Sequence, residues 1–121
     1  MIYKVKAKVI NATIGEFYRK LLDGTIAKQR PDGKEITASM KRAVLTSPGV
    51  AEWYEECFCP TPLQHERRTQ YDFYFTDITT ENAEGYDEIK GGCVVLWNYM
   101  ASKADAAKRV EKTDARDRGP R

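Results

Sequence analysis

The first ten residues constrain the fold most, because apolar and charged side chains alternate along them. In MIYKVKAKVI, lysines separate apolar residues at every second position. An extended strand presents successive side chains to opposite faces, so this period predicts a half-buried strand. The apolar face is Tyr3, Val5, Ala7 and Val9, and the other face is Lys4, Lys6 and Lys8. We interpret the lysine face as solvated or as protection of a sheet edge, with an anion-binding or nucleic-acid surface as the alternative.

The stretch NATIGEFYRKLLDG changes to the period of a helix. From Ile14 to Leu22, apolar residues recur at i, i+3, i+4, i+7 and i+8, which is typical of a helix that packs on a sheet. Thr13 is the predicted N-cap, with Glu16 as its capping-box partner. Gly24 is the predicted left-handed residue behind the helix, although the next residues could extend it.

The middle of the chain is predicted to form a turn and then a hairpin. Pro31 and Gly33 predict a turn in RPDGK, with Gly33 free to adopt a positive φ. The residues that follow fit a helix and a strand almost equally. The turn signal Pro48-Gly49 decides for a hairpin, preceded by a short helix or strand. The two predicted arms are about 40–46 and 50–59.

The stretch PTPLQHERRTQYDFYFTDITT also fits two periods. As a strand it would place Tyr71, Phe73 and Phe75 on one face. We favour a helix, because Thr61 as N-cap and Pro62 as first helical residue form a specific start signal, with Gln64 as capping-box partner. The stripe of this predicted helix is Leu63, Gln70, Tyr71, Tyr74, Phe75 and Ile78.

These elements predict an α+β fold. The simplest layering is one antiparallel or mixed sheet with helices on one face. The element types are those of small ferredoxin-like domains, an architecture that does not by itself indicate a function. CVVLWNYM is either a last strand or the start of a terminal helix. We therefore predict a compact domain over 1–101 and a charged, partly disordered tail over 102–121.

Charge and cysteine content exclude several classes of protein. The tail carries seven Lys/Arg and four Asp/Glu, whereas the rest carries 13 and 14, so the basic excess lies outside the predicted domain. A dedicated nucleic-acid-binding role is therefore disfavoured. The 3 cysteines cannot pair completely, which is untypical of a secreted framework. With no signal peptide and no long apolar run, we expect a soluble, cytoplasmic protein.

The stretch EECFCPTPLQHERR concentrates the residues with chemical potential. If 50–59 is a strand, Trp53, Glu55, Cys57 and Cys59 share the face that is the better core candidate. A carboxylate on that face must be paired, hydrogen-bonded or neutralised by a raised pKa, unless register or an edge position leaves Glu55 in water. We include Glu55 among the predicted catalytic residues because perturbed carboxyl groups are enriched at active sites.

Cys59 and His65 are the other predicted catalytic residues. Cys59 would precede a helix N-terminus, where a thiolate is favoured, and His65 would lie in the first turns of that helix. Arg67 and Arg68 could bind an anionic substrate. The alternative is that the cysteines are inert core residues and the histidine has no role.

A metal site and a nucleotide site are both disfavoured. Four residues, Cys57, Cys59, His65 and Cys93, would be just enough for zinc. The C-x-C spacing argues against it, because same-face residues of a strand splay roughly 6.5–7 Å apart. The chain has no phosphate-binding glycine loop. We therefore predict no metal and no cofactor.

The aromatic content favours a binding domain. The chain has 2 Trp, 7 Tyr and 4 Phe, more than a core of this size needs, so some should line a pocket or an interface. We predict a small-molecule-binding or interaction domain that forms a homo-oligomer, with Trp53, Tyr71, Arg67 and Arg68 as ligand-binding residues. The alternative is a small thiol-dependent enzyme for acyl or thiol transfer that uses Cys59 and His65.

Overall fold

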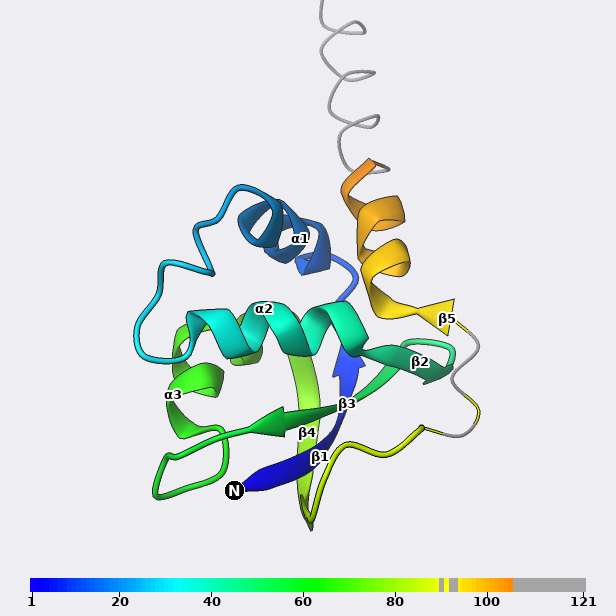
Figure 1. Ribbon diagram of the computed structural model, residues 1–121. Helices are drawn as coiled ribbons and strands as arrows, with labels where there is room; N and C mark the ends of the chain where they lie inside the picture. The colour runs from blue at the N-terminus through cyan, green and yellow to red at the C-terminus, as the bar shows by residue number, and fades with distance from the viewer. Residues whose placement is uncertain (90, 92–93, 106–121) are drawn as a thin grey trace, which may run out of the picture.

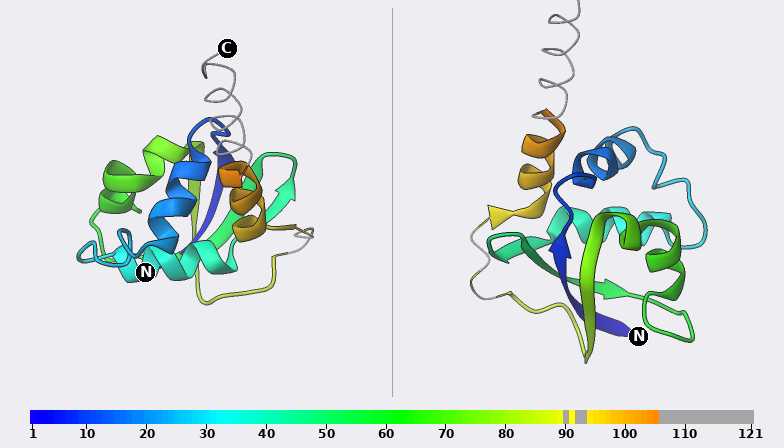
Figure 2. Two further views of the ribbon diagram at one scale, coloured as in Figure 1. Left: turned by 90° about the horizontal axis from the view of Figure 1, so that it is seen from above. Right: turned by 180° about the vertical axis from the view of Figure 1, so that it is seen from behind.

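The computed structural model describes residues 1–89, 91 and 94–105. It contains one antiparallel sheet of five strands in the order β4-β1-β3-β2-β5, with helices on one face (Figures 1 and 2), which confirms the predicted α+β fold. The strands are β1 (Ile2–Val9), β2 (Val44–Ser47), β3 (Val50–Glu56), β4 (Phe75–Ala83) and β5 (Val94–Val95). The helical segments are α1 (Ile14–Leu22), α2 (Gly33–Arg42), α3 (Gln64–Glu66), the π-helix η1 (Arg67–Tyr71), α4 (Asp72–Tyr74) and a helix over 96–105.

The N-terminal strand forms as its alternation predicts. β1 lies between β4 and β3, and its apolar face is in the core, with Val5 fully buried. The lysines are on the opposite face, where Lys4 pairs with Glu52 and Lys8 pairs with Asp77. Because β1 has a partner on both sides, the lysines mark a solvated face and not a sheet edge.

The first helix is also confirmed, with a different cap. Thr13 is at the N-cap position, but its hydroxyl donates to the backbone oxygen of Phe73 at 2.8 Å instead of capping the first turn. Gly24 follows the helix with a φ of 85°, as predicted. Leu22, the last residue of the predicted stripe, is exposed.

The prediction for the middle of the chain is partly wrong. Residues 40–42 belong to helix α2, because Ile36 and Met40 are one turn apart and both fully buried. Gly33 begins this helix, and a Cβ there would lie 2.0 Å from the Ile26 backbone oxygen. The glycine therefore permits a close approach, and it does not have the expected positive φ. The hairpin itself is confirmed, with Gly49 at a φ of 74°.

The predicted strand over 50–59 ends early, and the predicted helix over 62–78 is helical only in its first part. β3 ends at Glu56, and the helical run begins at Gln64, after Leu63 at the N-cap with a φ of 57°. The helical run ends at Tyr74 because the chain then enters β4, where Phe75 pairs with Val9 of β1. Ile78 is therefore a strand residue.

The last apolar segment is predicted to be either a final strand or the start of a terminal helix, and its described residues form a short strand followed by a helix. β5 pairs with β2, and a helix follows directly over 96–105. Ala104 of this helix packs closely on Gly15 of α1. Cys93 and residues 106–121, most of the predicted tail, lie outside the described residues.

Within residues 1–89, 91 and 94–105, no helix is long and apolar enough to span a membrane.

Candidate functional site

The stretch that follows β3 folds back on itself. Its start is held at the N-terminus, because the Cys57 amide donates to the Met1 backbone oxygen at 2.8 Å. The Cys59 amide then donates to the Cys57 sulfur at 3.3 Å. The two cysteines are therefore not splayed as same-face residues of a regular strand would be, because the strand has ended before them.

A pocket of about 260 Å³ opens beside this turn. It is bounded by the end of β3, the start of α2 and the helix that begins at Gln64. Its lining residues are Pro31, Asp32, Glu35, Glu56, Cys57, Phe58, Cys59 and Glu66. We call it the thiol pocket. Phe58 is 84% exposed, so one wall of the pocket is a largely solvated aromatic ring.

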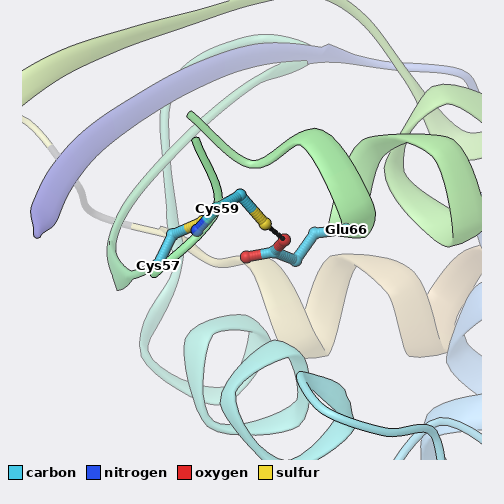
Figure 3. A group of neighbouring side chains, drawn as sticks. All are labelled: Cys57, Cys59 and Glu66. Atoms are coloured by element: carbon cyan, nitrogen blue, oxygen red, sulfur yellow. Dashed lines mark hydrogen bonds between the residues drawn. The ribbon is translucent and has the colours of Figure 1, made fainter. Parts of the chain in front are cut away.

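Two thiols and a carboxylate meet in the wall of this pocket. One donor atom each from Cys57, Cys59 and Glu66 lies within 4.8 Å of the others. Figure 3 shows the Cys59 thiol and the Glu66 carboxylate pointing toward each other, at 3.4 Å from Sγ to Oε1. Cys57 and Glu66 are buried, at 3% and 1% exposure, and Cys59 is partly exposed.

The environment of Cys57 favours the neutral thiol in the absence of a cation. Burial raises the pKa of Cys57 to about 12, and the nearby amides of Cys59 and Leu63 oppose this shift. Since only the thiolate is a strong nucleophile, this shift disfavours a nucleophilic role for Cys57 at neutral pH.

Glu55 lies in the core, so the alternative that it is in water is wrong. Its Oε1 accepts hydrogen bonds from the Trp53 indole at 2.9 Å and from the Tyr71 hydroxyl at 2.6 Å. Its Oε2 is the buried side-chain oxygen without a partner among the described residues. Burial raises the pKa of Glu55 to about 8, against the lowering effect of the two hydrogen bonds. The carboxyl group is therefore mostly protonated at neutral pH.

A polar network lies on the other side of the pocket and includes His65. The His65 Nδ1 contacts Oδ2 of Asp32, whose Oδ1 accepts a hydrogen bond from the Gln29 amide at 2.7 Å. The same Gln29 amide also contacts the hydroxyl of Thr69 at 2.8 Å. Asp32 lines the thiol pocket, and His65 is beside it as the partner of this carboxylate.

The remaining predicted site residues lie away from the pocket lining. Trp53 and Tyr71 are fully buried and form an aromatic pair, 5.3 Å between ring centroids. Arg67 pairs with Asp72 on the surface at 3.0 Å, and Arg68 is exposed. The structure thus brings Glu55 together with the two predicted aromatic residues, and neither arginine lines the pocket that contains Cys59.

Sequence reasoning missed the acidic residues of the pocket. Glu66 had a signal, because it is three residues after Leu63 and four before Gln70, both in the predicted apolar stripe. A carboxylate at that spacing faces inward. Asp32 and Glu35 had no comparable signal, because tertiary contacts between α2 and the turn behind β3 bring them to the pocket.

Comparison of the chain with family models, curated proteins and solved structures found no match.

Proposed function

We propose that this protein is a binding domain whose ligand site is the thiol pocket, and that the ligand is a small cation: an amine, a guanidine or a metal ion. The observation that carries the proposal is the charge of the lining. It contains four carboxylate residues, and none of its described members has a basic side chain. A concave surface lined by one sign of charge attracts ligands of the opposite sign.

The four carboxylates are not equally available to a ligand. Glu35 accepts hydrogen bonds from Arg42 at 2.7 Å and from the Glu56 amide at 2.9 Å, so its charge is largely balanced. Asp32 is held by its histidine and glutamine partners. The Glu56 side chain is exposed, whereas Glu66 is buried with a thiol as its hydrogen-bond donor. We therefore assign the strongest attraction for a cation to Glu66, with Glu56 at the mouth.

This proposal differs from the anionic ligand that the sequence predicted. That ligand depended on Arg67 and Arg68, which do not line the pocket.

The second candidate remains a thiol-dependent enzyme, because Cys59 is partly exposed in the wall of the pocket. Formation of a homo-oligomer stays a prediction, which size-exclusion chromatography with light scattering tests.

The test uses the full chain with matched small ligands in metal-free buffer. We expect propylamine and guanidinium to shift the backbone NMR signals of residues around the pocket, and we expect propionate, of similar size and opposite charge, to leave them unchanged. Glu56→Gln should weaken amine binding by up to about fivefold, the range for an exposed ion pair. Glu81→Gln, an exposed carboxylate on β4, is the control that should bind like the parent chain. The proposal is wrong if the pocket signals respond to propionate alone, or to none of amine, guanidinium and zinc.

A further inference from the structure

The arrangement of Cys57, Cys59 and Glu66 narrows the class of cation. Thiolate sulfur is a soft ligand and carboxylate oxygen a hard one, and borderline Zn²⁺ accepts both. Two thiols in one wall would serve no purpose for an amine, which needs only carboxylate acceptors. The sequence argued against zinc because a regular strand would splay these cysteines, and the turn after Glu56 removes that objection.

The spacing of the three ligand atoms is close to that around a tetrahedrally coordinated zinc ion, and the cluster would have to contract only slightly to match it. Bonds of about 2.3 Å to sulfur and 2.0–2.2 Å to oxygen place tetrahedral ligand atoms about 3.6–3.8 Å apart. The Cys59 sulfur and the Glu66 oxygen are already 3.4 Å apart, and no pair in the cluster exceeds 4.8 Å. A pair at the upper limit of 4.8 Å would have to close by about 1 Å to reach this spacing.

The surroundings of the three ligands also favour a cation. Glu66 is 1% exposed, and none of the ion pairs between described residues includes it. Its hydrogen-bond donor is a thiol, a weak donor for a buried carboxylate. The Cys57 sulfur accepts the backbone N–H of Cys59, which is the kind of outer contact that orients a thiolate ligand.

We propose that Cys57, Cys59 and Glu66 bind Zn²⁺ or a similar borderline divalent cation, with a fourth coordination position open to the thiol pocket. On binding, two Sγ–metal bonds and one carboxylate–metal bond form, and the two thiol protons leave to solvent. Three protein ligands with one open position are the pattern of a zinc site that also accepts an exogenous ligand. This inference rests on the proposed function, since it names the cation that the pocket holds.

The experiment titrates the full chain, reduced and freed of metal, with Co²⁺. We expect a thiolate-to-cobalt charge-transfer band that saturates at one ion per chain and is displaced by zinc. Cys59→Ser and Glu66→Gln should each weaken zinc binding by about 100-fold or more. Glu81→Gln, the same chemical change at an exposed position of β4 outside the pocket, is the matched control and should bind zinc like the parent chain. Absence of the band, or an undiminished affinity in Cys59→Ser, would overturn the inference.

A second measurement does not depend on the folding of any variant. X-ray absorption of the zinc-loaded parent chain should show two sulfur and one or two oxygen or nitrogen neighbours. A first shell without sulfur overturns the metal site. Binding of propylamine at the pocket in the absence of zinc binding overturns the metal inference and leaves the proposed function standing. Loss of both amine and zinc binding overturns both.

Discussion

The buried carboxyl group of Glu55 should make the stability of the protein fall as the pH rises. The pKa of Glu55 is about 8 in the folded state, against 4.5 when the group is in water. Between these two values the unfolded chain releases a proton that the folded chain retains, so the folded state binds more protons. The free energy of unfolding therefore decreases with increasing pH in this window. The stabilisation is fully present below pH 4.5 and is lost as the pH passes through 8.

The magnitude follows from the width of the window. Each pH unit between the two pKa values removes about 1.4 kcal/mol, which gives about 5 kcal/mol in total. A domain of this size is typically stable by about 5–15 kcal/mol, so the effect is a large fraction of the whole. Glu55→Gln retains an oxygen that can accept from Trp53 and Tyr71, and it removes the titration.

The assay is urea denaturation of the metal-free chain at several pH values from 4.5 to 8, followed by tryptophan fluorescence, since Trp53 is fully buried. We expect the stability of Glu55→Gln relative to the parent to improve by about 5 kcal/mol across this range. Glu56→Gln changes the exposed neighbour and should show no such trend. A constant difference between the parent and Glu55→Gln at every pH would refute the reasoning.

Two further predictions concern backbone packing and thiol reactivity. Gly33→Ala should destabilise the protein by about 3 kcal/mol, because the new Cβ would lie 2.0 Å from the Ile26 backbone oxygen. Thermal denaturation measures the effect, with Gly85→Ala as the control, since a Cβ there would have nothing within 4 Å. Equal unfolding midpoints for the two variants would contradict the predicted clash at Gly33. Iodoacetamide at pH 8 should label Cys59 and spare Cys57, because burial raises the pKa of the Cys57 thiol to about 12. Peptide mass spectrometry measures the labelling of each cysteine. Equal labelling would contradict the prediction, because it would show that Cys57 is accessible as a thiolate.

The thiol pocket illustrates what a sequence pattern does not contain. Glu66 had the spacing of a buried helical residue, and the two cysteines lie close in the chain. Their approach depends on where β3 ends, which is a property of its pairing with β1 and not of the residues 57–59 themselves. Asp32 and Glu35 come from a segment more than 20 residues earlier, so no local period relates them to the thiols.

The sequence by itself determined the elements whose signals are local. The alternation of the first ten residues, the stripe from Ile14 and the turn at Pro48-Gly49 each act within a few residues. Only the tertiary structure decided where the helix after Leu63 stops and which side chains form the pocket. Phe75 leaves the helical pattern because β1 offers it a partner at Val9, 66 residues earlier, and hydrogen bonding to a strand so distant in the chain outweighs local periodicity.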